Sequence, residues 1–416
     1  MDLLKRNIAG RLIEALSDTP VVLLHGSRQT GKSTLVQDIS RDEHSASYVT
    51  FDDVTTMGAA KRDPLGFLEA YNGPLILDEV QRVPEILVAI KTLVDRQRTP
   101  GRFLLTGSAN VLLLPKLSES LTGRMEVLTL WPFSQGEIES RQETFIDAVF
   151  SERKLAYPSG WSMDRVDLIA RVLRGGYPEI IQRKTQPRRT AWFEAYLTTV
   201  IHRELRDLAN IEYLTELPRL LRLLAARAGS QLNYTEISGS VGLPQTTVKR
   251  YLSLLETLYL LIPLPAWAPN LGKRLIKRPK ILLNDSGLIA HLTRLDERQV
   301  EKDATLFGPV LENFVAMETR KQISWSRTRP SMYHFRTRTG AEVDLVLESP
   351  SGDLVGIEIK AAARVRNGDL RGLELLRELA GKRFRRGIIL YTGKERIPFG
   401  KDLYALPIDS LWQIGA

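Results

Sequence analysis

The spacing of apolar residues changes along the chain, and its first part indicates an α/β arrangement. Up to about residue 130, short apolar runs alternate with stretches of helical period at residues 3–16, 33–39 and 84–97. Short, continuously apolar runs are typical of buried strands, whereas apolar residues three or four positions apart indicate a helix with one buried face. Buried strands that alternate with helices form parallel sheets covered on both faces. We therefore predict a parallel sheet with strands at residues 21–25, 48–51, 75–77, 103–106 and 126–130.

After residue 133 the pattern becomes mainly helical and later returns to strands. Residues 164–228 have helical period, interrupted by a Gly-Gly-Tyr-Pro turn at 175–178. The stretch 265–272 contains two prolines and a glycine and is predicted to be a linker or a wing. The predicted boundaries are 1–135 for the parallel-sheet domain, 136–230 for a helical region, 231–280 for a compact third part and 281–416 for a C-terminal α/β domain.

The first predicted strand leads into a phosphate-binding loop. Gly26, Gly31, Lys32 and Ser33 fit the pattern G-x-x-x-x-G-K-[ST] of P-loop NTPases, with an apolar strand before it and a helix after it. Glycines let the backbone wrap its N–H groups around phosphates, and the helix directs its positive N-terminus at them. Lys32 is expected to contact the β- and γ-phosphates of ATP, and Ser33 to bind Mg²⁺. The predicted nucleotide contacts are Gly26, Ser27, Arg28, Gln29, Thr30, Gly31, Lys32, Ser33 and Thr34.

Two carboxylates follow the third predicted strand. In a doubly wound sheet the carboxyl ends of the strands line the ligand crevice. Asp78 is therefore predicted to be a Mg²⁺ ligand, and Glu79 the base that activates the attacking water. The alternative is that both acids only stabilise the start of a following helix. Having both acids next to a phosphate loop favours ATP hydrolysis over nucleotide binding alone.

Polar residues after other strands offer further contacts, each with a structural alternative. Ser108 or Asn110 is placed to contact the γ-phosphate or the water, unless this segment is a simple turn. Asp52 and Asp53 either assist the Mg²⁺ or cap a helix. Arg124 is a candidate arginine finger, acting within the chain or on a neighbouring subunit, and its alternative is a surface ion pair.

Together these stretches resemble the AAA-type ATPases of bacteria and archaea that carry a carboxy-terminal domain of unknown function. The resemblance covers nearly the whole chain, and the order of its motifs is more specific than the phosphate loop alone. It implies a nucleotide-driven protein that acts on or near DNA. It rests on the phosphate loop and on residues 77–81, 105–108, 121–124, 175–178, 308–314 and 340–344.

Residues 235–252 read as a helix, a tight turn at Gly242 and a second helix, and the apolar run 258–264 then fits a strand of a wing. In winged-helix and related motifs the second helix places its first residues in the DNA major groove. Such units also act as scaffolds for other proteins. The apolar residues expected to pack the helices are Ile237, Val241, Val248 and Leu252, and the residues expected to face DNA are Gln245, Thr246, Thr247, Lys249 and Arg250.

The C-terminal part resembles the PD-(D/E)xK nuclease-like fold. Glu312 lies on a predicted helix and Asp344 on a strand, and Glu358 and Lys360 share one face of the next strand. The resemblance implies that Asp344 and Glu358 bind a metal, that Glu312 belongs to the same set, and that Lys360 positions water or stabilises charge. A domain of this kind can also bind DNA without cutting it.

Charge is unevenly divided along the chain and bears on the partner. The first 150 residues contain 16 Lys and Arg against 20 Asp and Glu, whereas the rest contains 42 against 29, which gives net charges of −4 and +13. A basic second half favours a nucleic acid partner, with a solvated basic surface as the alternative. The sequence has no Cys, which excludes disulfides and thiolate metal sites. It shows no leader peptide and no apolar run long enough to span a membrane, so we expect a cytoplasmic protein without a membrane partner.

Three functional hypotheses remain. The leading one is an AAA-type ATPase, using ATP and Mg²⁺, whose nucleotide state controls a DNA-binding and nuclease-like second half. The second is a nucleotide-switched scaffold that recruits proteins and whose nuclease-like domain is silent. A small-molecule kinase is third, and Asp78, Glu79 and the basic second half argue against it. A homo-oligomer with Arg124 acting in trans is compatible with the first two.

Overall fold

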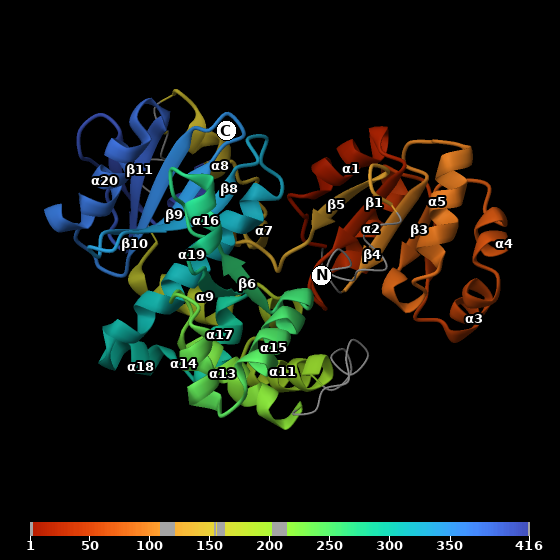
Figure 1. Cartoon of the computed structure of the whole chain (residues 1–416), viewed down its shortest axis with the longest axis horizontal. Coiled ribbons are helices and arrows are strands. Elements are labelled where there is room, and N and C mark those ends of the chain that lie inside the picture. The colour runs from red at the N-terminus through yellow and green to blue at the C-terminus, as the bar shows by residue number, and fades with distance from the viewer. Residues whose placement is uncertain (1–2, 109–120, 154, 156–162, 202–213, 415–416) are drawn as a thin grey trace. The chain divides into compact units, whose positions relative to one another are not determined.

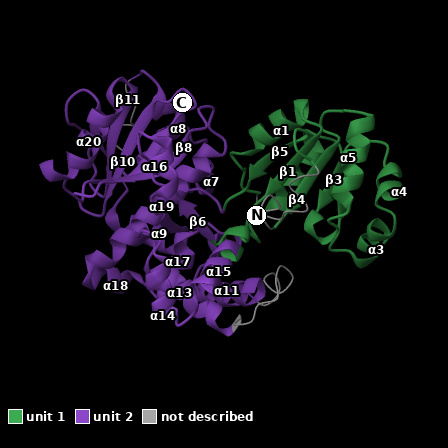
Figure 2. Cartoon of the chain, viewed as in Figure 1, with its two compact units in different colours: residues 1–131, 254–260 green, residues 132–253, 261–416 purple. Residues whose placement is uncertain are grey.

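A computed structural model describes residues 3–108, 121–153, 155, 163–201 and 214–414 (Figure 1). The chain divides into two compact units. Unit 1 contains residues 1–131 and 254–260, and unit 2 contains residues 132–253 and 261–416 (Figure 2). Among the described helices none is long and apolar enough to cross a membrane.

Unit 1 is built on a five-stranded sheet in the order β2-β3-β4-β1-β5, and all of its strand pairs are parallel. Buried residues alternate along β1: Val21 and Leu23 pack in one apolar cluster with α5, while Val22 and Leu24 are buried outside that cluster. This confirms the predicted parallel α/β sheet of a P-loop NTPase. The strands are β1 (Val21–His25), β2 (Ser47–Thr50), β3 (Leu75–Asp78), β4 (Phe103–Gly107) and β5 (Met125–Thr129).

In the described part of unit 1 up to β5, one helix precedes the first strand, and the others lie between strands. The first helix begins six residues later than predicted. The two short helices between β2 and β3 were not predicted. The Asp63 side chain caps the second of these, and Pro64 is at its first position, where a missing N–H costs nothing. The helices are α1 (Ala9–Asp18), α2 (Lys32–Asp42), α3 (Val54–Arg62), α4 (Pro64–Glu69), the 3₁₀ turn η1 (Val80–Arg82) and α5 (Ile86–Arg96).

Unit 2 begins with helices, as the sequence predicts. The Gly-Gly-Tyr-Pro turn separates two of them, and Pro178 starts the second. Tyr177 is fully buried and its hydroxyl bonds to that of Tyr196 at 2.8 Å. The elements are α7 (Gln135–Ile138), α8 (Phe145–Phe150), α9 (Arg165–Arg174), α10 (Pro178–Gln182), α11 (Gln186–Thr199), η4 (Leu214–Glu216) and α13 (Leu217–Ala226).

A helix pair and a two-stranded antiparallel sheet follow. The pair is α14 (Tyr234–Val241) and α15 (Gln245–Thr257), and the sheet joins β6 (Leu261–Leu264) to β7 (Lys280–Leu283). The strand predicted at 258–264 starts only at Leu261, because Tyr259 adopts a left-handed conformation at φ 58° just after α15. Between β6 and β7 lies α16 (Leu271–Ile276).

The linker interpretation of residues 265–272 is wrong at its centre. Trp267 is fully buried and packs edge-on against Phe335, with ring centroids 5.9 Å apart, in the apolar core of the C-terminal sheet. Proline and glycine mark a break in regular structure, but they do not show whether the aromatic residue between them is buried.

The C-terminal sheet has six strands in the order β12-β13-β11-β10-β9-β8. It is mixed, because β8, β9 and β10 are antiparallel neighbours whereas β10, β11 and β13 run parallel. The described elements after β7, in chain order, are α17 (Ser286–Thr293), α18 (Glu297–Lys302), η5 (Ala304–Leu306), α19 (Phe307–Ile323), β8 (Ser331–Arg336), β9 (Glu342–Glu348), β10 (Leu354–Lys360), η6 (Asn367–Leu370), α20 (Arg371–Ala380), η7 (Gly381–Arg383), β11 (Phe384–Tyr391), β12 (Ile397–Pro398), β13 (Leu403–Pro407) and α21 (Ser410–Gln413).

Candidate functional site

The phosphate loop connects β1 to α2 in unit 1. Gly31 has φ 91°, a left-handed conformation that favours glycine, and a side chain at Gly26 would collide with the backbone oxygen of Leu130. The Leu35 N–H donates to the Gly31 oxygen at 2.9 Å, so the first turn of α2 directs its amide groups toward the loop. The loop thus has the backbone geometry of an anion site.

Lys32 is buried, and its ammonium group donates to the backbone oxygens of Gly26 and Ser27, both at 3.0 Å. The Thr30 hydroxyl also donates to the Ser27 oxygen at 3.0 Å. Of the other predicted contacts, Arg28 is half-buried, and Gln29 and Thr34 are exposed. The loop therefore holds the Lys32 ammonium group inside its own curve, where a phosphate would compete for it.

Asp78, at the end of β3, is surrounded by hydroxyl groups. Ser33 Oγ donates to its two carboxylate oxygens at 3.0 and 3.1 Å, and Tyr48 OH donates at 2.8 Å. Thr50 and Thr106 donate from the neighbouring strands β2 and β4. Burial and the adjacent Asp78 carboxylate raise the pKa of Tyr48 to about 12. Sequence analysis missed Tyr48 and Thr50, although their i, i+2 spacing on β2 places them on one face.

The pair Ser33–Asp78 fits a Mg²⁺ ion. Magnesium prefers oxygen ligands, keeps several waters, and is usually held by one or two carboxylates together with substrate phosphates. Here a serine hydroxyl from the first turn of α2 and the carboxylate of Asp78 meet at 3.0 Å. Within the described residues there is no group of three or more His, Asp or Glu side chains that could hold a metal without such help.

Glu79 lies directly after the Asp78 strand with a left-handed backbone, φ 61° and ψ 46°. Its N–H donates to Thr106 Oγ1 at 3.1 Å. Its carboxylate accepts from Ser108 Oγ at 3.2 Å and from the Gln81 amide, and this amide also donates to Ser108 at 2.8 Å. The strand ends of β3 and β4 thus place Glu79 and Ser108 together as predicted, and Gln81 is a third member that the sequence did not indicate.

Other predicted residues have structural partners. Asp53 caps α3 by accepting from the Thr56 N–H at 2.7 Å, and Asp52 pairs with Arg82 at 2.5 Å. Asp53 therefore has the helix-capping role that the sequence left open, whereas the ion pair of Asp52 was not predicted. Arg124 forms a two-pronged ion pair with Asp95, at 2.5 and 3.1 Å. Its function as an arginine finger stays a prediction, and Asn110 lies outside the described residues.

His25, the last residue of β1, joins the phosphate loop to a distant segment of unit 1. Its Nδ1 is 2.5 Å from the Tyr259 hydroxyl and its Nε2 is 2.8 Å from Thr129 Oγ1. Burial, assisted by the charge of Lys32, lowers the pKa of His25 to about 3. The folded protein therefore keeps this imidazole neutral.

A pH dependence of stability follows from His25. The unfolded chain protonates this histidine below about pH 6.5, whereas the folded chain does so only near 3, so stability falls as the pH drops through that window. We expect a contribution of about 2 kcal/mol to be lost between pH 6.5 and 5. Thermal midpoints at pH 7, 6 and 5 should decline more steeply for the wild type than for His25→Gln. Equal slopes in the two proteins contradict the assignment.

The predicted C-terminal residues also come together, with one addition. Lys280, on β7, is buried, and its ammonium group lies 2.6 Å from Glu312 Oε1 and 3.0 Å from Asp344 Oδ1. Sequence analysis missed Lys280, because its partners lie 32 and 64 residues away and nothing local marks it. Two acids predicted to belong to a metal site thus share one lysine.

Glu358 and Lys360 project from one face of β10, as predicted, and form an ion pair at 2.8 Å. Burial and the neighbouring Asp344 raise the pKa of Glu358 to about 8, and the same two causes raise the pKa of Glu312 to about 7. Both shifts have the same origin, the crowding of buried acids around Asp344.

The helix pair has the predicted packing. Gly242 is left-handed at φ 74° and ends α14. Ile237, Val241, Val248 and Leu252 are all buried. Gln245, Thr246, Lys249 and Arg250 are exposed at the start of α15, and Thr247 is half-buried. The surface that would face a partner is therefore polar and basic.

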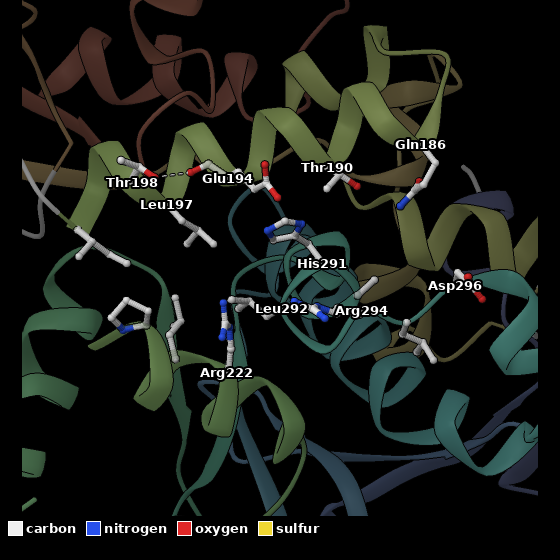
Figure 3. Close-up of a pocket in the computed structure, with 15 residues that line it drawn as sticks. Gln186, Thr190, Glu194, Leu197, Thr198, Arg222, His291, Leu292, Arg294 and Asp296 are labelled. Atoms are coloured by element: carbon white, nitrogen blue, oxygen red, sulfur yellow. Dashed lines mark hydrogen bonds between the residues drawn. The ribbon is translucent and has the colours of Figure 1, made fainter. Parts of the chain in front are cut away.

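A separate pocket of about 450 Å³ lies in the helical part of unit 2 (Figure 3). Helices α11, α13 and α17 contribute to its lining, which includes Glu194, Arg222, His291 and Arg294. None of its lining residues belongs to the phosphate loop or to the C-terminal acidic cluster.

Comparison with known proteins agrees with the geometry of unit 1. Residues 18–139 match the model of a family described as an AAA domain. Residues 165–299 and 307–411 match two domains of unknown function, DUF8612 and DUF4143. The uncharacterized proteins Rv2008c of Mycobacterium tuberculosis and Mb2031c of Mycobacterium bovis are each 32% identical to this chain over 418 residues, which cover 99% of this chain and 85% of theirs.

The chain belongs to the family of these mycobacterial proteins. Its N-terminal part is an AAA-type P-loop ATPase domain. Among solved structures, the Holliday junction branch migration motor RuvB of Thermotoga maritima is 20% identical and is matched over 62% of this chain and 89% of its own, with a TM-score of 0.29. A signal transduction ATPase with a tetratricopeptide repeat sensor from Pyrococcus horikoshii is 12% identical over 76% and 46%, with a TM-score of 0.24. Neither likeness is close enough to carry an argument.

Proposed function

We propose that this member of the family hydrolyses ATP at the phosphate loop of unit 1. The observation that carries the proposal is the contact of Ser33 with Asp78, at 3.0 Å, immediately before Glu79. A site that only bound nucleotide would need the phosphate loop and the Mg²⁺ ligands, but no acid to activate water. A half-buried acid positioned one residue beyond the metal ligand adds a group that can activate water.

Binding uses the loop and Lys32. The backbone amides of the loop and of the first turn of α2 face a bound triphosphate. The ammonium group of Lys32 moves from the Gly26 and Ser27 oxygens, its present partners at 3.0 Å, to the β- and γ-phosphates. Ser33 and Asp78 would hold Mg²⁺, which would neutralise charge on the phosphates.

Hydrolysis uses Glu79. Its carboxylate accepts a proton from the attacking water, while Ser108 and Gln81 fix its orientation by the bonds they donate. Thr106 fixes the backbone at the same point through the Glu79 N–H. In an oligomer, Arg124 would leave Asp95 and stabilise charge on a neighbouring subunit's γ-phosphate.

We further propose DNA as the partner of the basic second half, with the helix pair read as a winged helix. Polar and basic side chains of the kind that contact bases and phosphates are exposed at the start of α15. The nuclease-like domain would add binding surface. An ATPase assay with and without DNA, at a fixed salt concentration, tests the coupling: stimulation supports it, and turnover that no DNA changes favours a nucleotide-switched scaffold for proteins.

A charge-removal experiment tests the DNA surface directly. We expect Lys249→Ala with Arg250→Ala to weaken DNA affinity about tenfold and to lower the salt dependence by about two ions, because each side chain releases roughly one counterion. The matched control is Arg298→Ala with Lys302→Ala, which removes the same charge from α18. If both double variants lose affinity equally, the binding is not specific to α15.

A further inference from the structure

The C-terminal cluster resembles the metal site of a nuclease in residue type and order, but its contacts differ. Lys280 belongs to β7, outside the six-stranded sheet that carries Asp344 and Glu358. Its ammonium group lies between a carboxylate oxygen of Glu312 and one of Asp344, at 2.6 and 3.0 Å. If Glu312 and Asp344 shared a metal ion, that ion would lie at this position between their carboxylates.

Two further oxygens of the cluster have protein partners. Asp344 Oδ2 accepts from the Ile359 N–H at 2.9 Å. Glu358 Oε1 accepts from Lys360 at 2.8 Å. Glu358 Oε2 is buried without a hydrogen-bond partner among the described residues. The oxygens of Glu312 and Asp344 that a shared metal ion would need are the ones that contact Lys280.

Burial makes the lysine a permanent member of the cluster. Lys280 is 4% exposed and Asp344 is 7% exposed. A buried ammonium group without carboxylates, or buried carboxylates without a cation, would be strongly destabilising. Each charge therefore stabilises the others, and a divalent ion shared by Glu312 and Asp344 would have to displace the Lys280 ammonium group from between them.

We infer that Lys280 takes the place of the metal ion, so that it forms with Glu312 and Asp344 a metal-free ion cluster that fastens β7 to α19 and β9 instead of cutting nucleic acid. The Glu358–Lys360 ion pair is separate from it. The residues do not fit Mg²⁺, and the resemblance to a nuclease is one of fold and residue order. The inference does not depend on ATP hydrolysis in unit 1.

Manganese binding by the full-length, nucleotide-free wild type is the first test. We expect an electron paramagnetic resonance titration with Mn²⁺ to give the same binding for the wild type and for Asp344→Asn, because no ion is held at Asp344. Mn²⁺ binding, or Mn²⁺-dependent nicking of DNA, that is present in the wild type and lost in Asp344→Asn overturns the inference. Because this comparison leaves Lys280 unchanged, it tests the inference even if the lysine variants do not fold.

The second test removes the internal cation. In EDTA we expect Lys280→Met to lower the thermal midpoint by about 5–10 °C, because two buried carboxylates lose their counter-ion. Millimolar Mn²⁺ should recover part of that loss, and adding Asp344→Asn should abolish the recovery. The matched control is Lys302→Met, at an exposed lysine of α18, where we expect a small change and no recovery. A Lys280→Met protein that is as stable as the wild type, or that Mn²⁺ does not stabilise, contradicts the inference.

Discussion

Replacing Lys32 by Ala is expected to reduce ATP turnover at least about 100-fold, equivalent to about 2.7 kcal/mol of transition-state stabilisation. The loop holds the Lys32 ammonium group inside its curve, through the Gly26 and Ser27 oxygens. Charge on the transferred phosphoryl group then lacks its counter-ion from the loop. Steady-state ADP release measures the effect, and a fluorescent ATP analogue measures the accompanying loss of affinity.

The control for this substitution is Lys61→Ala, at an exposed lysine on α3 of the same unit. It removes the same charge without touching the loop, and turnover should stay within about twofold of the wild type. The thermal midpoint of Lys32→Ala without nucleotide must also be measured, because two hydrogen bonds within the loop are lost. A folded Lys32→Ala protein with nearly normal turnover would show that hydrolysis occurs elsewhere.

The Glu79→Gln protein is expected to bind ATP with affinity near that of the wild type and to hydrolyse it at least about 100-fold more slowly. Glutamine has the same shape and its oxygen still accepts from Ser108 and Gln81, which the Glu79 carboxylate does now. Only the ability to take a proton from water is lost. Single-turnover assays should therefore show ATP accumulating on the protein.

Glu85→Gln is the matched control, because Glu85 is an exposed acid a few residues further along, at the start of α5. It should hydrolyse ATP at the normal rate. If Glu79→Gln does so as well, the base lies elsewhere. If instead Glu79→Gln fails to bind ATP, Glu79 is needed for the geometry of the phosphate loop and does not activate the water.

The geometry around the phosphate loop could be predicted from the sequence because each of its parts is local. The spacing of Gly26, Gly31 and Lys32 fixes the shape of one loop, and the apolar run before Asp78 and Glu79 fixes where the strand ends. A parallel sheet then brings strand ends to one edge without further information. The hydroxyls of Tyr48, Thr50 and Thr106 and the amide of Gln81 escaped prediction, since which side chain reaches Asp78 or Glu79 depends on packing.

The C-terminal cluster differs, because residue order along the chain does not show which cation lies among the acids. The sequence correctly placed Glu312 on a helix and Asp344, Glu358 and Lys360 on strands. It contained no sign of Lys280, whose contacts depend on how β7 packs against α19 and β9. The same limit explains Trp267, which fills an apolar core although its neighbours along the chain are typical of a loop.

The sequence by itself therefore determined the parallel sheet, the phosphate loop and the acids beside it, since short-range spacing controls backbone conformation and the end of each strand. Only the tertiary structure decided how charges are paired: Arg124 with Asp95, His25 with Tyr259, and Glu312 and Asp344 with Lys280. The physical reason is that a buried charge or polar group takes whichever partner the fold brings within about 3 Å, however far away that partner is in the chain.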